Sequence, residues 1–192
     1  MAALTMRGLA RSLNISPGNL NYYYQSKSNL LQDLVDFVLD PYLVEFRRLR
    51  SVSANSPEAQ LRSVFEYVYD ELGQRPTTHF FPELWALALR HDWAQRQMER
   101  MYSTYRKTLR DLILILRPDL DLQTIRDITL TVSASIEGHT VFIGYGKSHE
   151  HRAKHIKSLL IDQLMSLVTN PSRELPPTEM MSTRTDTPHA FE

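Results

Sequence analysis

The chain of 192 residues has no cysteine, which excludes disulfide bonds and thiolate metal sites. It also has no apolar run near the roughly 18 residues that a membrane-spanning helix needs. No charged-then-apolar leader of the kind that directs secretion is visible. We therefore expect a protein without a membrane partner, located in the cytoplasm.

Acidic residues are missing from the first 32 positions. The charged residues in this stretch are Arg7, Arg11 and Lys27, and the first acidic residue is Asp33. The whole chain balances 22 Lys and Arg against 22 Asp and Glu, so its net charge of zero hides this asymmetry. Because DNA-binding surfaces neutralise phosphates with basic side chains, any DNA-facing surface is expected at the N-terminus.

Helical periodicity runs through nearly the whole sequence, and glycine and proline fall mostly where helices would begin or end. The pattern predicts an all-α protein without a sheet. Beyond the first 50 residues, the predicted helices cover about 57–73, 80–90, 93–116, 122–144 and 149–169. Residues 171–192 are rich in Pro, Ser and Thr, and we expect a disordered tail there.

Two short helices are predicted at the N-terminus. Thr5 is positioned to cap the first, whose apolar face holds Met6, Leu9, Ala10 and Leu13 at helical spacing. After a short turn, Ser16 can cap the second, with Pro17 at its first position, and this helix runs to about Tyr23. Leu9, Leu13, Ile15 and Leu20 would form the small core of the pair.

A third cap at Ser26 opens a longer helix with a broad apolar face that includes Leu31, Val35 and Leu39. Asp40-Pro41 is expected to kink or interrupt this helix, because proline lacks the backbone N–H and restricts the residue before it. Two short helices joined by a tight turn are the layout of a helix-turn-helix.

The run from Leu4 to Leu31, LTMRGLARSLNISPGNLNYYYQSKSNLL, closely resembles the TetR family pattern of helix, turn, recognition helix and Ser-Lys at the next helix. Asn21 and Tyr24 depart from it, since the family usually has Tyr and Phe there. The resemblance implies a one-component transcriptional regulator, most often a repressor, that binds double-stranded operator DNA. It divides the chain into a DNA-binding domain at 1–40, a helical ligand-binding and dimerisation domain at 41–170, and the tail at 171–192.

Carried over by position, the family's DNA contacts would fall on Thr5, Arg7, Ser16, Gly18, Asn19, Tyr22, Tyr23 and Lys27. The chemistry fits, because Arg7 and Lys27 can neutralise phosphates and Asn19 can reach a base edge. Tyr22 and Tyr23 can touch the DNA backbone or thymine methyl groups. Packing within the domain is an equally available role for the two tyrosines.

TetR-like domains carry a further helix of about a dozen residues before this pair, and only three residues precede Leu4 here. Two hypotheses follow. Either the start codon has been assigned too late or the N-terminus has been cut, which we favour, or the chain is a helical ligand-binding or interaction module with impaired DNA binding. Without that helix, Leu9, Leu13 and Leu20 would be covered only by the helix that follows the pair.

In the family, the last two helices pair with their copies in a homodimer, which a two-fold axis makes self-complementary. The corresponding helices here are those near 122–144 and 149–169. Their apolar stripes consist of Ile125, Ile128, Thr129, Val132, Ser135, Ile136, Thr140 and Ile143 in the first, and Ile156, Leu159, Leu160, Gln163, Leu164 and Leu167 in the second. Such stripes are also typical of any buried helix.

An unidentified small-molecule effector would bind between the middle helices, where large aromatic side chains with polar tips can line a cavity. The candidate lining residues are Phe81, Trp85, Met98, Tyr102, Tyr105, His139 and Phe142. Any of them could instead be ordinary core. Glu137 and His139 stand out because a titratable group in an apolar helix is costly unless it has a partner. A hinge near Pro41 would let the ligand alter the spacing of the two recognition helices.

An enzyme is the main alternative class, and its best support is the pair His151 and His155, spaced as metal ligands on a helix can be. The flanking Lys147, Arg152, Lys154 and Lys157 favour a solvated helix start instead. No third ligand, phosphate-binding loop or nucleophile motif accompanies the pair. We therefore expect no catalytic activity, no metal and no cofactor.

Overall fold

The computed structural model of the chain describes residues 5–51 and 56–170. Within these two stretches every regular element is helical, which confirms the all-α prediction. The elements in chain order are α1 (Met6–Ser12), α2 (Pro17–Tyr23), α3 (Lys27–Ser51), α4 (Pro57–Leu72), α5 (Arg75–Ala88), α6 (Asp92–Leu116), α7 (Leu122–Gly138), α8 (Thr140–Ile143), the 3₁₀ turn η1 (Glu150–Arg152) and α9 (Ala153–Thr169). The tail expected at 171–192 lies outside the described residues.

The three predicted N-caps are confirmed. The side-chain oxygens of Thr5, Ser16 and Ser26 each accept the backbone N–H of the residue three positions later, at 3.0, 3.0 and 3.2 Å. Each bond satisfies a donor that a helix start leaves unpaired, so the caps define where α1, α2 and α3 begin. Asp121 caps α7 in the same way.

The predicted helix boundaries near prolines need correction. α3 runs without interruption through Pro41, and α5 begins at Arg75 and contains Pro82 in its interior. A proline removes one backbone hydrogen bond, but α3 buries Leu39 before Pro41 and Leu43 after it, and the helix lies along α6. Burial on both sides of the proline therefore keeps the helix continuous.

The helix predicted over 122–144 is divided at His139. α7 ends at Gly138 and the four-residue α8 follows. The backbone N–H of His139 donates to the carbonyl of Ile136 at 3.1 Å, the tighter hydrogen bond of a closing turn. The side chains after His139 consequently leave the helical register of α7.

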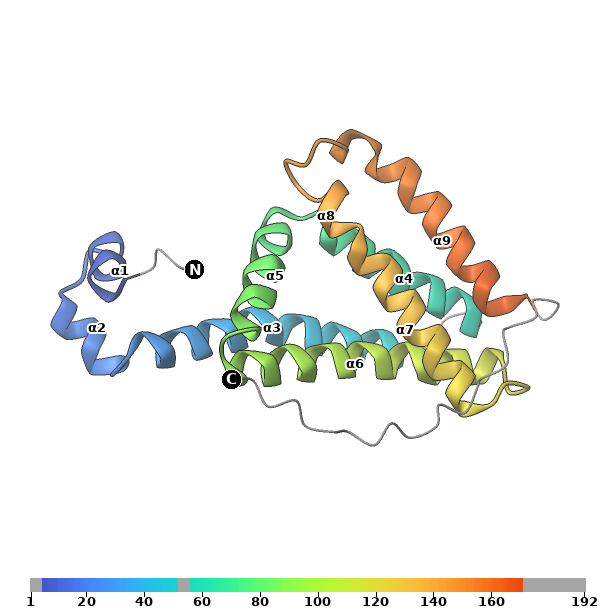
Figure 1. Cartoon of the computed structure of the whole chain (residues 1–192), viewed down its shortest axis with the longest axis horizontal. Coiled ribbons are helices and arrows are strands. Elements are labelled where there is room, and N and C mark those ends of the chain that lie inside the picture. Colours follow the sequence, from blue (N-terminus) through green and yellow to red (C-terminus); the bar gives the residue numbers. More distant parts are fainter. Residues whose placement is uncertain (1–4, 52–55, 171–192) are drawn as a thin grey trace, which may run out of the picture.

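Two parts of the molecule differ in how they are packed (Figure 1). We call α1 and α2, residues 5–23, the helix pair, and α3 to α9 the body. In the body, α6 contacts α3, α4, α5, α7 and α9, and the apolar core is continuous across these helices. The helix pair lies at the far N-terminal end of α3, away from this core.

The helix pair has little interior of its own. Ala10 and Leu20 are buried and Leu9 and Ile15 are partly buried, but Leu13 is 55% exposed. The expectation that Leu13 belongs to the small core is therefore wrong. None of the helices in the described part of the chain combines the length and apolar character that spanning a bilayer requires.

Candidate nucleic-acid interface and internal cavity

A tight turn sets the angle between α1 and α2. Asn14 adopts a positive φ of 55°, the left-handed conformation that asparagine tolerates better than most residues. The following N–H, of Ile15, donates to the carbonyl of Ala10 at 3.0 Å. The turn brings the capped start of α2 directly after the end of α1, as a helix-turn-helix requires.

The outer face of α2 is polar and aromatic. Ser16, Gly18 and Asn19 are exposed, and Tyr22 and Tyr23 are 82% and 71% exposed. The two tyrosine rings meet edge to face, with centroids 5.2 Å apart. Core packing is therefore excluded as the role of these two tyrosines in this chain, and their rings are available to a partner.

The remaining predicted DNA contacts lie near the same face. Thr5 caps α1, Arg7 is exposed on its first turn, and Lys27 is the first residue of α3. Lys27 is partly buried and lines a cleft of about 430 Å³ with residues of α5 and of the turn after it, among them Glu83 and Arg90. The structure thus groups all eight predicted residues around the helix pair and its junction with α3.

A small cavity lies in the body, where α3, α4, α5, α6 and α7 meet. It holds about 20 Å³, room for roughly one water molecule. Its apolar lining consists of Phe46, Val68, Leu72, Phe81 and Met101. Its polar lining consists of Tyr42, Tyr67, Glu71, Thr77, Tyr105 and Glu137.

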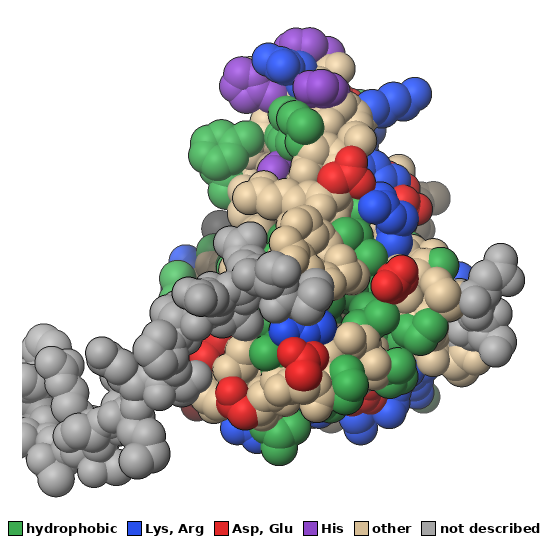
Figure 2. Space-filling view, turned by 90° about the vertical axis from the view of Figure 1, so that its right-hand side faces the viewer, with side chains coloured by type: hydrophobic (Ala, Val, Ile, Leu, Met, Phe, Trp, Pro, Cys, Tyr) green, Lys and Arg blue, Asp and Glu red, His purple; other side chains and the backbone are tan. Residues whose placement is uncertain are grey.

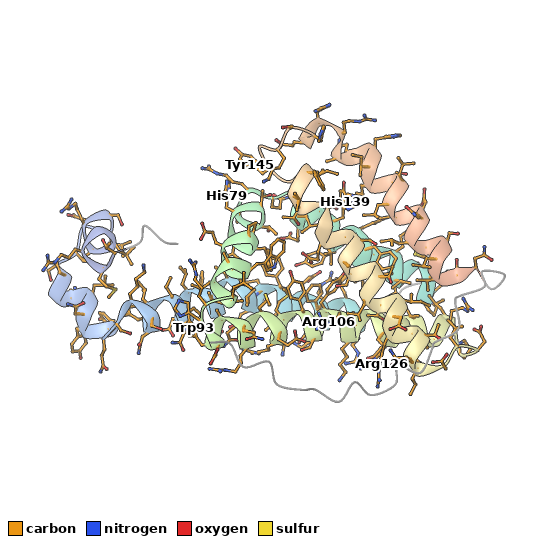
Figure 3. All side chains as sticks on the ribbon, in the orientation of Figure 1. His79, Trp93, Arg106, Arg126, His139 and Tyr145 are labelled. Carbon is orange, nitrogen blue, oxygen red and sulfur yellow. The ribbon has the colours of Figure 1, made fainter. Side chains whose placement is uncertain are left out.

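Two open grooves lie on the surface next to this cavity. One, of about 560 Å³, is lined by Trp85, Met98 and Tyr102 together with Ala88, Leu89 and Gln95. The other, of about 390 Å³, shares Trp85 and Tyr102 and adds residues of α7, including Glu137. Figure 3 shows Arg106, another residue of the second groove, extending from α6 beside α7.

Five of the seven predicted effector residues line these spaces, Phe81 and Tyr105 in the cavity and Trp85, Met98 and Tyr102 in the grooves. His139 and Phe142 line none of the three. The ring of His139 packs against Tyr69 with its Nδ1 2.6 Å from the carbonyl oxygen of Ser135 (Figure 3), and Phe142 is 62% exposed. His139 keeps helical backbone angles and lies two residues after Glu137, about 200° further around the helix axis, so its side chain points away from the cavity that Glu137 lines.

A short chain of hydrogen bonds links the grooves to the cavity. The Trp85 Nε1–H donates to Tyr102 Oη at 3.0 Å, and the Tyr102 O–H donates to Glu137 Oε2 at 3.3 Å. Burial raises the pKa of Glu137 to about 7, and the hydrogen bond from Tyr102 opposes this rise only in part. Burial, followed by the nearby Glu137 carboxyl, also raises the pKa of Tyr102.

The polar groups around the cavity are not all paired. Tyr42 Oη and Thr77 Oγ1 lie 2.8 Å apart and share a hydrogen bond. The Tyr105 hydroxyl has no hydrogen-bond partner although its side chain is buried. An unpaired hydroxyl in an interior costs free energy, so the atom marks a place where a ligand or a water could bind.

The apolar stripes predicted to face a second copy are mostly used within the chain. Ile125, Ile128, Val132 and Ile136 of α7 are buried in the body's own core, as are Leu160 and Leu164 of α9. The ion pairs Lys157–Asp70 and Arg62–Asp162 fix α9 against α4. The apolar side chains these two helices leave exposed are Leu122, Leu130 and Leu159.

The histidine pair considered as a metal site lies at the start of α9. His151 and His155 are exposed, and Figure 2 shows histidines gathered with basic side chains at the upper end of the face that carries this helix. Within residues 5–51 and 56–170, no three His, Asp or Glu side chains are grouped so that they could hold a metal ion.

Sequence reasoning missed Tyr42, Tyr67 and Glu71 as cavity residues. Tyr42 follows Pro41, where a break was expected, and the other two lie on a helix not assigned to the cavity. The sequence contained one signal for Glu71 as a cavity residue. It is an acidic residue directly before Leu72, at the end of an apolar helix face.

Comparison with solved structures identifies a similar protein, a TetR transcription regulator from Haloarcula marismortui ATCC 43049. The TM-score is 0.64 and the sequence identity 18%, over 88% of this chain and 85% of that one. No protein-family model matches the chain, and no curated protein matches it in sequence. The structural comparison thus confirms the fold that the N-terminal motif implied: the chain has the fold of a TetR transcription regulator.

Proposed function

We propose that the chain is a one-component transcriptional regulator, acting as a repressor, whose helix pair binds operator DNA and whose body binds a small-molecule effector. The observation that carries the proposal is the exposed recognition face of α2, which stands clear of the body at the end of α3 (Figure 1). The resemblance of residues 4–31 to the TetR pattern and the shared fold both support it.

The chemistry of the helix pair suits a DNA partner. Arg7 and Lys27 can neutralise phosphates, and no acidic residue lies between positions 5 and 32 to oppose them. Asn19 projects from the first turn of α2 and has the amide geometry that reads adenine in the major groove. Tyr22 and Tyr23 can pack on sugar or thymine methyl groups beside it.

The continuous helix α3 connects the proposed DNA-binding face to the proposed effector-binding cavity. α3 begins at Lys27, beside the recognition helix, and further along the same helix Tyr42 and Phe46 line the cavity. A ligand that displaces the cavity wall would therefore tilt α3 and move α2. Two recognition helices must lie about 34–36 Å apart on DNA, and a typical allosteric coupling of about 1–3 kcal/mol changes affinity roughly 5- to 150-fold.

A homodimer would place two helix pairs on one operator. We propose that α7 and α9 form its interface through the face that carries Leu130 and Leu159, since their buried stripes are occupied within the chain. Leu159→Arg should shift the protein to monomer in sedimentation equilibrium. Ile115→Arg, at an equally exposed position on α6, should leave the dimer intact. A monomeric parent protein would remove this part of the proposal.

The deciding experiment is selection of duplexes from a randomised pool, followed by fluorescence anisotropy titration at several salt concentrations. The proposal predicts one preferred sequence and affinity that falls steeply with salt. Asn19→Ala should lose about 1–3 kcal/mol of discrimination at one base pair, whereas Lys27→Ala should weaken all sequences alike. Lys107→Ala, an exposed lysine on α6, is the matched control.

The selection also separates the two functional classes considered for this chain. Equal and weak binding to every duplex, unaffected by Asn19→Ala, would favour a helical ligand-binding or interaction module that does not read DNA.

A further inference from the structure

The internal cavity has an unusual combination of side chains. Of its 11 lining residues, five are aromatic and two are carboxylic acids, Glu71 and Glu137, while none is Lys, Arg or His. Aromatic faces and carboxylates are the two kinds of group that attract organic cations. An anionic ligand would instead be brought next to two carboxylates with no positive charge in the lining.

Two polar groups in the lining of the cavity remain available to contact a ligand. Within the described chain Glu137 forms no ion pair, and its carboxylate accepts one hydrogen bond, from Tyr102. The Tyr105 hydroxyl is buried and unpaired. A partly buried acid with a single hydrogen bond and a buried hydroxyl with none are costly to the protein, so a ligand that contacts both would be bound favourably.

The cavity adjoins the surface grooves. Glu137 lines both the cavity and the groove of about 390 Å³, and Trp85 and Tyr102 line both grooves. The hydrogen-bonded side chains of Trp85, Tyr102 and Glu137 therefore lie where the cavity and the grooves meet. A drug-sized ligand needs about 300–1,000 Å³, which the cavity alone lacks and a groove joined to it can provide.

We propose that the effector is an organic cation, an amine with an apolar or aromatic body. Its ammonium group would contact the Glu137 carboxylate and the Tyr105 hydroxyl oxygen, and its body would lie over Trp85 and Tyr102. That the ligand acts as an effector rests on the proposed function, whereas its chemical class follows from the lining of the cavity and of the adjoining grooves.

The basic residue in the grooves does not contradict this assignment. The Arg106 guanidinium forms an ion pair with Glu99 at 2.5 Å and lies over the Tyr102 ring, 6.0 Å from its centroid. Glu99 is exposed, so this positive charge is held on the solvent side of Tyr102. The Tyr102 hydroxyl donates to the Glu137 carboxylate, which lines the cavity as well as the groove.

Proton exchange gives the proposal a direct signature. Because burial raises the pKa of Glu137 to about 7, the acid is partly protonated at neutral pH, and a bound ammonium would favour its ionised form. Binding near pH 7 should therefore release a proton. The other titratable or charged groups around Glu137 are Glu71 on α4, Tyr42 on α3, Tyr67 on α4, and Tyr102, Tyr105 and Arg106 on α6.

The test uses three probes with the same apolar body, 4-phenylbutylammonium, 4-phenylbutanol and 4-phenylbutyrate, titrated into the full chain by isothermal calorimetry. The ammonium should bind about tenfold or more tightly than the alcohol, and the carboxylate weakest. The heat should differ between phosphate and Tris buffers by the number of protons released multiplied by the difference between the ionisation enthalpies of the two buffers. Equal or tighter binding of the carboxylate, or no saturable ammonium binding up to about 5 mM, would overturn the proposal.

Variants locate the site. Glu137→Gln should reduce ammonium affinity to that of the alcohol and abolish proton release. Tyr105→Phe should weaken ammonium binding while leaving the fold at least as stable, because it removes an unpaired buried hydroxyl. Glu58→Gln, an exposed acid in the first turn of α4, is the matched control and should change neither. Unchanged ammonium selectivity in Glu137→Gln would place the cation elsewhere and reject this site.

Anisotropy with the selected duplex separates this inference from the proposed function. If the duplex is bound specifically but the ammonium is not preferred over the alcohol, the regulator stands and the ligand class fails. If the ammonium is preferred and lost in Glu137→Gln but no duplex is selected, the ligand class stands and the regulator fails.

Discussion

The helix pair and the body are stabilised in different ways. In the helix pair, Ala10 and Leu20 are buried, and the structure depends on two side-chain caps and the left-handed turn at Asn14. In the body, a continuous apolar core joins α3 to α9. The recognition surface can therefore rearrange at little cost in free energy, whereas the body has enough buried area to hold a cavity with an unpaired hydroxyl and an acid whose pKa is raised by burial.

The largest expected effect is a loss of core packing in the body. Phe65 on α4 is fully buried, and Phe65→Ala should lower the free energy of unfolding by about 3–5 kcal/mol, through lost apolar burial and the space left behind. Urea denaturation followed by circular dichroism, at one fixed protein concentration, measures it. Phe37→Ala, at a position on α3 that is 77% exposed, is the matched control and should change stability by less than about 0.5 kcal/mol.

Leu20→Ala tests whether the helix pair and the body unfold as one cooperative unit. Leu20 is as deeply buried as many core residues, with 4% of its surface exposed. We expect its loss to increase hydrogen exchange in residues 5–23 while the urea midpoint of the body stays nearly unchanged. A global loss like that of Phe65→Ala would mean that the helix pair and the body unfold together.

The next effect is a change in stability with pH that comes from Glu137 in the body. The folded pKa of Glu137, about 7, lies above its ordinary value of 4.5, so the folded state binds more protons than the unfolded state between these values. The stability that comes from the protonated acid is fully present below pH 4.5 and is lost as the pH rises through 7. The difference amounts to at most about 3 kcal/mol.

Glu137→Gln isolates this contribution. The variant should lose the decline in stability between about pH 5 and pH 8, and at pH 8 it should be more stable than the parent by about 2–3 kcal/mol. Thermal or urea unfolding at half-unit pH steps gives the two curves, with Glu58→Gln as control. Parallel curves for parent and Glu137→Gln would show that the acid is solvated in the folded protein.

The sequence predicted the helix pair well because its determinants are local. Thr5 and Ser16 each accept a hydrogen bond from a backbone N–H three residues later, and Pro17 occupies the first position of α2, so these helix starts depend on short-range chemistry. Leu13 was placed wrongly because apolar spacing shows which side chains share a face, not whether another element covers that face. Covering depends on tertiary packing.

The cavity was harder to predict for the same reason. Aromatic composition identified Phe81 and Tyr105, yet Tyr42 and Glu71 come from segments 29 residues apart that only the fold brings together. His139 and Glu137 looked alike in sequence, as titratable residues in an apolar helix. They are two positions apart, which places them about 200° apart around the helix axis, so one lines the cavity and the other packs against Tyr69.

The smallest expected effect gives the sharpest comparison, because the chain carries the same cap in both regions. Ser16 precedes Pro17 and accepts the N–H of Asn19 at 3.0 Å, and Ser56 precedes Pro57 and accepts the N–H of Ala59 at 3.1 Å. Replacing either serine with alanine removes one hydrogen bond at a helix start and should cost about 1 kcal/mol locally.

The two losses should appear in different measurements. Ser56→Ala should lower the global free energy of unfolding by about 1 kcal/mol, because α4 contributes to the body's core. Ser16→Ala should leave that value nearly unchanged, but it should speed hydrogen exchange in α2 and weaken binding to the selected duplex, since the pair must stay ordered to present Asn19. If both variants lowered global stability equally, the helix pair would be as firmly coupled to the core as α4 is, and α3 would transmit unfolding as well as movement.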